Sequence, residues 1–292
     1  MKYTGPTFRP PLEANTLLLQ VTVGCAHNKC SFCTMYKDVK FHIEGMEQIE
    51  KDLKEAKAKL GSVKRIFLVN GDAFVLSARR LKAISDLIIS YFPKIETITM
   101  YASIRNIRDK SDEELEMLKQ ARINELWIGL ETGHAHTLEK LNKGYTLDEV
   151  YMHLNRLNKL NIIFNGIFML GAGGLNQGQA CGLDTAKLIN ECKPNLVGFT
   201  TLGLFNGSQL ESWYNRGEFI PATELEILEE EKTLIENITV DSIPFFANHP
   251  TNAANISGRL PRDRKKMIDE INSLIEDVDD DFLMSYANRF GL

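Results

Sequence analysis

The sequence predicts an α/β fold in which strands and helices alternate, because three patterns recur along its 292 residues. Six continuous apolar runs have strand length, which is typical of parallel strands covered by helices. Amphipathic segments with helix-capping signals lie between these runs. Such alternation implies right-handed βαβ units and a parallel sheet. Six units predict a closed or three-quarter barrel whose site lies at the carboxyl ends of the strands.

The individual elements follow from local signals. The predicted strands are residues 16–22, 65–69, 97–101, 125–131, 162–170 and 195–202. The segment 44–60 has apolar residues at helical spacing, and Gly61 is suited to end that helix. Three capping boxes, each a hydroxyl residue three positions before a glutamate, mark helix starts at Ser111 with Glu114, Thr146 with Glu149, and Thr223 with Glu226.

The alternation of strands and helices stops after about residue 205. Residues 206–219 have the composition of a loop with turns, and a long helix is predicted at 224–238. An apolar segment at 242–250 and a helix at 262–277 follow. We therefore predict a barrel core over residues 1–205 and a C-terminal α-rich extension over 206–292 that packs on the barrel or covers its mouth.

Composition narrows the class of protein. The 34 basic and 39 acidic residues give a net charge of −5, which weighs against bulk electrostatic binding of nucleic acid. The sequence shows neither a cleavable leader nor an apolar run near the roughly 18 residues that a membrane helix needs. Five cysteines, an odd number, fit a reducing compartment better than a disulfide framework. We expect a cytoplasmic protein that makes no membrane contact.

Three of the cysteines lie in one short loop directly after the first predicted strand. Cys25, Cys30 and Cys33 have the spacing C-x4-C-x2-C. A structural zinc site needs a fourth ligand, for which His27 is the nearby candidate. A redox dithiol of Cys30 and Cys33 leaves Cys25 without a role. An iron–sulfur cluster held by three thiolates leaves one iron open for a small molecule that carries an amine and a carboxylate.

With Phe32 before the last cysteine, this loop resembles the cysteine motif of the radical S-adenosylmethionine (SAM) superfamily, which is usually C-x3-C-x2-C. The first gap here is one residue longer. The resemblance implies a partial (βα)6 TIM-like barrel and a 4Fe–4S cluster on the three cysteines. It also implies that the methionine part of SAM binds the fourth iron, with Phe32 and Tyr36 on the cofactor side.

Two further strand ends agree with this family. Gly71 and Asp72 end the second predicted strand and resemble a Gly-Gly-Glu element that holds the amino group of SAM. The alternative is a βα turn in which Asp72 caps a helix. Ser103 and Arg105 end the third strand, and their alternation predicts that both point into the barrel mouth. A guanidinium fork suits the SAM carboxylate, although the alternative is a solvated loop arginine.

The stretch 127–146 resembles the "GLESG … LKxxxKGxT" stretch of the branch that contains oxygen-independent coproporphyrinogen oxidase and the Elongator catalytic subunit. The resemblance places Glu131 near the amine or ribose of SAM. A carboxylate that ends an apolar strand is costly without a partner, which favours function. For Lys143, the alternative to a functional role is a lysine near a helix end that compensates the helix dipole. Gly171 opens a glycine cluster at 171–174 that the family places against adenine.

The resemblance implies a radical SAM enzyme. In this family a reduced cluster cleaves SAM, and the resulting 5′-deoxyadenosyl radical abstracts hydrogen from a substrate, here unidentified and expected to be small. The chemistry implies a flavodoxin- or ferredoxin-type electron donor and anaerobic function. Two alternatives remain. One is a tRNA-modifying radical SAM enzyme, which the net charge disfavours. The other is a zinc-stabilised barrel that serves as a non-enzymatic scaffold.

Other chemically active residues have simpler expectations. The stretch 245–266 is the expected substrate side, with Asn248, His249 and Asn252 as ligand-binding candidates and an Asn-rich surface loop as the alternative. A short basic run at 262–266 is either part of that side or a solvated helix start. Cys181 and Cys192 lie eleven positions apart on a predicted helix, and we expect buried core thiols rather than a second cluster.

Overall fold

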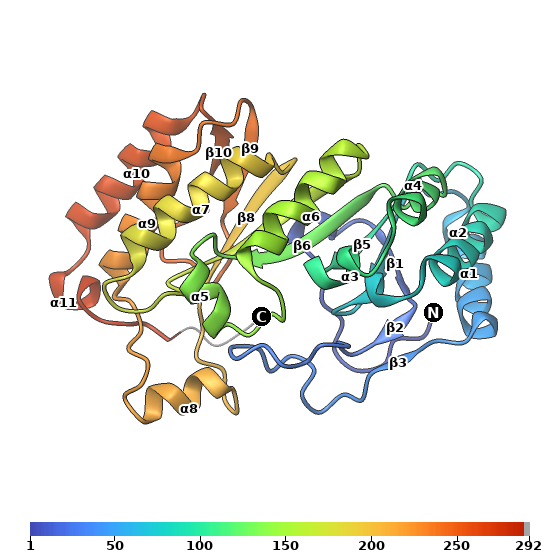
Figure 1. The fold of residues 1–292 in the computed structure, drawn as a ribbon, viewed down its shortest axis with the longest axis horizontal. Helices are drawn as coiled ribbons and strands as arrows, with labels where there is room; N and C mark the ends of the chain where they lie inside the picture. The colour runs from blue at the N-terminus through green and yellow to red at the C-terminus, as the bar shows by residue number, and fades with distance from the viewer. Residues whose placement is uncertain (289–292) are drawn as a thin grey trace. The chain divides into compact units, whose positions relative to one another are not determined.

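The computed structural model describes residues 1–288, which divide into two compact units that interleave along the chain (Figure 1). The first unit contains residues 1–28, 35–129 and 153–164. The second contains residues 29–34, 130–152 and the chain from 165 onward. Both units are built from mostly parallel strands joined by helices, as the sequence predicts.

The first unit has four parallel strands in the order β1, β4, β5, β6. These are β1 (Leu17–Gln20), β4 (Arg65–Val69), β5 (Thr97–Ala102) and β6 (Glu125–Glu131), of which the last two residues of β6 belong to the second unit. A short antiparallel pair, β2 (Thr22–Val23) and β3 (His42–Ile43), lies beside the cysteine loop in the sequence. Each parallel strand therefore points its carboxyl end toward the same edge.

The helices of the first unit connect these strands. They are η1 (Pro11–Glu13), α1 (Met46–Leu60), η2 (Ala73–Val75), α2 (Ala78–Tyr91), α3 (Ile104–Arg108) and α4 (Asp112–Gln120). Helix α6 (Leu147–Lys159) begins in the second unit and ends in the first. One face of the strands is wholly apolar, with Ile66, Leu68 and Met100 fully buried, as expected for the face that amphipathic helices cover.

The opposite face of the same strands is polar and aromatic. Arg65 donates hydrogen bonds to the buried carboxylate of Glu13 and to Glu125 at the amino ends of the strands. The indole nitrogen of Trp127 donates to Glu13 over 3.0 Å. These bonds lower the pKa of Glu13 although burial opposes the shift. A buried charge is tolerated here because its partners satisfy it.

The second unit has the strand order β7, β8, β9, β10, in which β7, β8 and β9 are parallel and β10 is antiparallel to β9. The strands are β7 (Ile163–Leu170), β8 (Leu196–Thr201), β9 (Ile243–Ala247) and β10 (Ile256–Leu260). The helices are α5 (Ala135–Lys140), α7 (Gly178–Cys192), α8 (Gln209–Asn215), α9 (Glu224–Asn237), α10 (Arg264–Asp277) and α11 (Asp280–Leu283). Helix α9 packs between α7 and α10, which lie side by side with it in Figure 1.

Aromatic stacking fixes which face of the second unit is its core. Phe168 of β7 stacks on Phe199 of β8 with ring centroids 5.4 Å apart, and Phe199 stacks on Phe245 of β9 at 4.6 Å. All three side chains are buried. Because side chains alternate along a strand, the residues next to each phenylalanine in its own strand face the opposite side of the sheet.

The six predicted strands are confirmed, with ends displaced by at most a few residues. The first is interrupted, since β1 ends at Gln20 and β2 begins at Thr22. Gly61 ends α1 with a φ of +67°, and each of the three capping boxes forms in both directions. One prediction was wrong: the expected loop at 206–219 contains α8, whose first turn is capped by Ser208.

The extension begins inside the second unit. Residues on both sides of position 205 belong to that unit, and α9 packs along α7. A separate boundary near residue 205 stays a prediction. Cys181 and Cys192 are buried on α7, as predicted, and burial raises their pKa values to about 11 and about 12. They are inert thiols at neutral pH.

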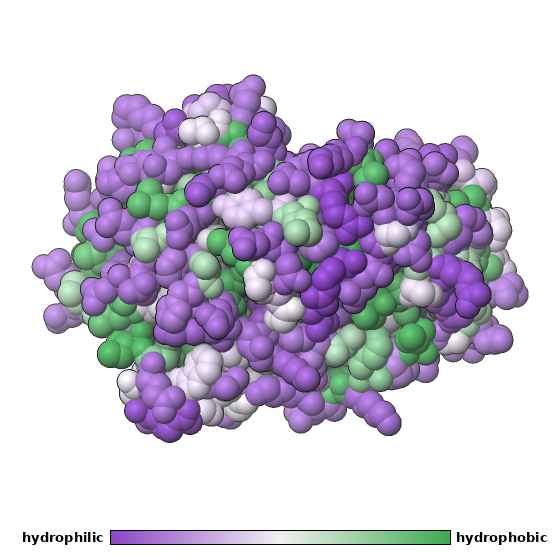
Figure 2. Space-filling model, in the orientation of Figure 1, coloured by the Kyte–Doolittle hydropathy of each residue, from purple (hydrophilic) through white to green (hydrophobic). Residues whose placement is uncertain are grey.

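Polar side chains cover most of the face shown in Figure 2, while the apolar side chains fill the strands and the inner sides of the helices. Over residues 1–288, we find no helix with the length and apolarity that a membrane crossing requires.

Candidate functional site

In the first unit, the carboxyl end of β4 packs directly against the cysteine loop. A Cβ atom at Gly71 would lie 2.6 Å from the ring of Tyr36 and 3.2 Å from Cβ of Cys25. Real Cβ atoms do not approach a ring that closely, and the Tyr36 ring is buried. Gly71 is therefore needed for space rather than for an unusual φ angle, and it lets the strand end meet Cys25 and Tyr36.

Arg105 joins the same loop to the end of β4. Its Nη1 donates to Nδ1 of His27 over 2.7 Å, and its Nη2 lies 3.9 Å from Oδ2 of the buried Asp72. Because a guanidinium has no acceptor, Nδ1 of His27 is the acceptor and carries no proton in this contact. The end of β4 and the cysteine loop thus meet at the guanidinium of Arg105 within the first unit.

Ser103 begins a helix rather than ending a strand, and its predicted contact with SAM stays a prediction. Its hydroxyl accepts from the backbone N–H of Asn106, and the Asn106 side chain accepts from the Ser103 N–H. The strand ends at Ala102 and α3 begins at Ile104, so the two-residue alternation with Arg105 does not continue. Ser103 is the N-cap of α3 and orients the helix that carries Arg105.

In the second unit, the segment 29–34 that contains Cys30 and Cys33 is held by the chain that follows α5. The Ser31 N–H donates to the Leu141 carbonyl over 3.1 Å, and its hydroxyl donates to the Lys140 carbonyl over 2.9 Å. Asn142 donates to the Lys29 carbonyl over 2.9 Å. From α8, the Leu210 N–H donates to the Ser31 carbonyl over 2.8 Å. The cysteine segment is therefore anchored from two sides.

Glu131 and Lys143 form an ion pair at the end of β6. Glu131 is buried and has a φ of +65°, a conformation that a non-glycine residue adopts at some cost. The Lys143 ammonium also lies 5.9 Å from the ring centroid of Phe32. Burial lowers the pKa of Lys143, but Glu131, Tyr145 and Cys30 together raise it well above its usual range. A fixed positive charge thus lies beside the cysteine segment.

Helix α9 of the extension packs against the glycine cluster that follows β7. The Gly171 N–H donates to Oε2 of Glu230 over 2.8 Å, and burial raises the pKa of Glu230 to about 8. Gly171 has a φ of +72°. A Cβ at Gly173 would lie 2.7 Å from Sγ of Cys181, and one at Gly174 would lie 2.6 Å from the Ile220 carbonyl. Gly173 and Gly174 are therefore needed because a larger side chain at either position would clash with its neighbours.

The three predicted substrate-side residues differ in their surroundings. The Asn252 amide donates to the carbonyls of Phe199 and Ala247 over 3.0 and 2.7 Å, and its oxygen accepts from Thr201 over 3.1 Å. This amide therefore fastens the loop after β9 to β8. His249 is half-buried, and burial lowers its pKa. Asn248 is exposed.

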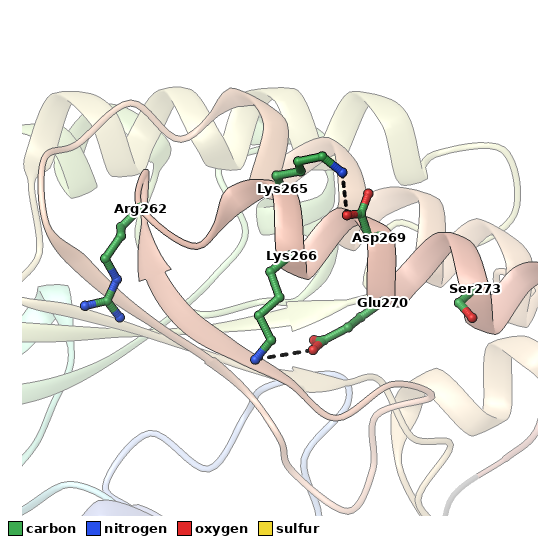
Figure 3. Close-up of a pocket in the computed structure, with 6 residues that line it drawn as sticks. All are labelled: Arg262, Lys265, Lys266, Asp269, Glu270 and Ser273. Atoms are coloured by element: carbon green, nitrogen blue, oxygen red, sulfur yellow. Dashed lines mark hydrogen bonds and ion pairs between the residues drawn. The ribbon is translucent and has the colours of Figure 1, made fainter.

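The basic run after β10 lies on the outer side of α10. A shallow hollow there is lined by Arg262, Lys265, Lys266, Asp269, Glu270 and Ser273 (Figure 3). Lys265 pairs with Asp269 at 2.6 Å, and Lys266 pairs with Glu270 at 3.5 Å. Arg262 pairs with Asp263 at 2.7 Å, so each of the three cations has a carboxylate partner, and the hollow offers no unpaired positive charge for an anion.

The three cysteines of the loop are divided between the two units. Cys25 belongs to the first unit, and Cys30 and Cys33 belong to the second. None of the five cysteines, all within residues 1–288, is in a disulfide. Over the same residues, no three His, Cys, Asp or Glu side chains stand close enough together to hold a metal ion. That the three cysteines share one cluster stays a prediction.

Comparison with known proteins decides the family. Residues 19–180 match the Radical SAM superfamily. The chain belongs to this superfamily. It is accordingly a radical SAM enzyme that uses a 4Fe–4S cluster and SAM. The residues present fit these cofactors: three thiols lie in one loop, Gly71 lets the end of β4 approach Cys25 closely, and an ammonium lies beside Cys30.

Three similar proteins place the radical SAM chain in context. An uncharacterized protein of Methanocaldococcus jannaschii is 26% identical over 279 residues, which cover 90% of this chain and 78% of that protein. Coproporphyrinogen III oxidase (HemN) of Escherichia coli has a TM-score of 0.54 at 14% identity and covers 76% of this chain. Elp3 of Methanocaldococcus infernus, with its N-terminus deleted, has a TM-score of 0.55 at 12% identity and covers 89% of this chain.

These structural likenesses confirm the predicted fold class, a partial (βα)6 barrel. The chain spans about half of HemN, 52%, and 63% of the Elp3 chain. Sequence reasoning missed the partner of Arg105. The available signal was the position of His27, two residues after Cys25 in the cluster loop.

Proposed function

We propose that this radical SAM enzyme removes a hydrogen atom from a small substrate and that Cys25, Cys30 and Cys33 hold its cluster. When bound, the cluster and SAM supply the one-electron cleavage that yields a 5′-deoxyadenosyl radical. The observation that carries the proposal is the Glu131–Lys143 pair, which lies next to the anchored segment with Cys30. A strained carboxylate and a fixed ammonium at one strand end are expected at a functional site.

In the first unit, the residues around Arg105 are suited to the amino-acid end of SAM. The guanidinium fork matches a carboxylate, and the buried Asp72 can accept from an ammonium group. His27 holds the guanidinium in place from the cysteine loop. We propose that Gly71 lets the end of β4 lie close to Cys25 and that Tyr36 forms a wall of this region.

In the second unit, Glu131 is proposed to accept from the amine or ribose hydroxyls of SAM while its ion pair with Lys143 holds the carboxylate in place. The ring of Phe32 lies beside the Lys143 ammonium. Gly171 is proposed to approach the adenine, held in place by the Glu230 carboxyl below it. Asn248 and His249 follow β9 and are proposed to face the substrate, whereas Asn252 orients their loop.

The extension 206–292 is proposed to support the cluster loop as well as to cover it. The hydrogen bond from Leu210 of α8 to Ser31 supports this role within the second unit. An acidic flavodoxin- or ferredoxin-type protein is proposed as the electron donor, because the exposed Lys29 and Lys140 flank the cysteine segment.

Anaerobic reconstitution with iron and sulfide tests the proposal. The loaded protein is expected to be brown, to bind about four irons per chain, and to release 5′-deoxyadenosine when SAM and dithionite are added. Cys30→Ser should lose both the iron and the product. Cys192→Ala, which removes a buried thiol of α7, is the matched control and should keep both. A colourless protein with one tightly bound zinc would overturn the proposal.

A further inference from the structure

The middle of β8 contains a glycine that neither the backbone nor the packing requires. Gly198 has no left-handed φ, and a Cβ placed on it would meet no atom within 4 Å. By contrast, a Cβ at Gly166 of β7 would lie 2.8 Å from Phe168, and one at Gly258 of β10 would lie 2.8 Å from the Met267 sulfur. Glycine weakens a strand interior, so its use at 198 calls for another reason, such as the close approach of a ligand.

The neighbours of Gly198 define a slot on the face opposite the buried phenylalanines. In the strand register, Gly198 pairs with Ile167 of β7 and with Phe246 of β9. All three residues are partly exposed, whereas Phe168, Phe199 and Phe245 are buried. We call the row Ile167, Gly198 and Phe246 the Gly198 slot. Its walls are an aliphatic and an aromatic side chain, and its floor is bare backbone.

The dimensions of the slot favour one flat group. Ile167 and Phe246 stand two strand spacings apart, about 10 Å between their backbones. After the volume of both side chains is subtracted, the remaining width accommodates the thickness of one planar ring. A ring that stands on edge over Gly198 could lie face to face with Phe246, an arrangement that aromatic pairs favour when offset.

The residues that form the slot and the row beside it carry no charge. The next row toward the strand ends pairs Met169 with Thr200, and Thr200 is partly exposed on the same side as Gly198. Asn248 and His249 follow the end of β9. The slot therefore offers apolar walls, with the Thr200 hydroxyl in the row above them. This pattern is typical of small-molecule sites, where few polar groups fix the orientation of an apolar body.

The depth of the slot separates it from the residues proposed to hold SAM. Ile167 lies four residues before Gly171 along β7, which corresponds to about 13 Å of strand. We propose, resting on the function proposed above, that the Gly198 slot binds a planar, uncharged aromatic or conjugated part of the substrate. The polar edge of that group faces Thr200.

The test uses 5-fluoroindole, a neutral planar probe, titrated into the cluster-loaded full-length protein and followed by fluorine NMR. Wild type is expected to bind it, and Gly198→Val, which fills the slot, should weaken binding by about tenfold or more. Phe246→Ala, which removes a wall instead, should also weaken binding. Ser257→Val adds the same branched side chain on the far side of Phe246 and should bind normally.

A second measurement identifies the occupant. The affinity of SAM and the dithionite-driven release of 5′-deoxyadenosine should be the same within about twofold in wild type and Gly198→Val. Loss of SAM affinity in Gly198→Val would show that the slot holds adenine, and would overturn the inference. Absence of probe binding in wild type, or equal binding to Gly198→Val, would overturn it too. Failure of wild type to form 5′-deoxyadenosine would instead refute the proposed function.

Discussion

Replacing Glu230 with glutamine is expected to remove a strong dependence of stability on pH. Glu230 is buried on α9, and its carboxyl accepts the Gly171 N–H at the glycine cluster. Burial raises its pKa from 4.5 to about 8. The folded protein therefore holds a proton on Glu230 more tightly than the unfolded chain does. Consequently the free energy of unfolding falls as pH rises from about 4.5 to about 8.

The size of this effect follows from the pKa difference, 8 − 4.5 = 3.5 units. At about 1.36 kcal/mol per unit, the full difference corresponds to about 5 kcal/mol. Of this, about 3.5 kcal/mol should be lost between pH 5 and pH 8. Glu230→Gln keeps the shape of the side chain and its acceptor for Gly171, but it does not titrate. The neighbouring Glu231 adds a loss in the same direction, since burial and Glu230 raise its pKa.

The assay is urea unfolding of the full chain at pH 5 and pH 8, followed by circular dichroism. Wild type should lose several kcal/mol more than Glu230→Gln between the two pH values. Glu229→Gln is the matched control, because Glu229 is the exposed neighbour on the same helix, and it should behave as wild type. Equal losses in wild type and Glu230→Gln would refute the argument that the buried carboxyl is protonated in the folded protein.

Three further substitutions test the two halves of the candidate site. Gly71→Ala should clash with the Tyr36 ring, cost about 1–3 kcal/mol and lower the iron content after reconstitution, as measured by iron assay. Lys143→Met should leave Glu131 buried and unpaired, cost about 3–5 kcal/mol and weaken SAM binding in equilibrium dialysis. Arg105→Lys should weaken SAM binding about tenfold while iron content stays normal, because an ammonium cannot reproduce the guanidinium fork.

Local signals in the sequence predicted the elements of the fold well. The strand at 125–131 and the box of Ser111 with Glu114 are both set by neighbours within a few residues. Such signals depend on side-chain alternation and on backbone groups at helix ends, which are encoded nearby. Helix α8 was missed because its seven residues lie among turn-forming residues. Its Leu210 belongs to a buried cluster that also contains Leu202 and Met169, and Met169 lies about forty residues earlier in the chain.

The sequence predicted which residues belong to the candidate site, but it did not predict which of them contact one another. Arg105 was identified from its place after a strand, yet its spacing from Ser103 gave the wrong geometry, because the backbone becomes helical between them. Its contact with His27 spans 78 positions, and no local pattern encodes such a distance. Glu230 was missed for the same reason: a glutamate on an acidic helix reads as solvated until the fold buries it under Gly171.

The long gap between the first two cysteines has a physical explanation in the first unit. Two residues of the gap AHNK make specific contacts there. His27 accepts from Arg105, and Asn28 donates from its amide to the Tyr36 carbonyl over 2.8 Å. Asn28 also has a φ of +45°, a left-handed conformation that asparagine tolerates better than most residues. The gap thus turns the chain after Cys25. This turn is bonded to Arg105 of α3 and to Tyr36, the residue that packs against Gly71. A shorter gap would have to give up one of these contacts, so the spacing C-x4-C-x2-C belongs with the choice of histidine and asparagine inside it.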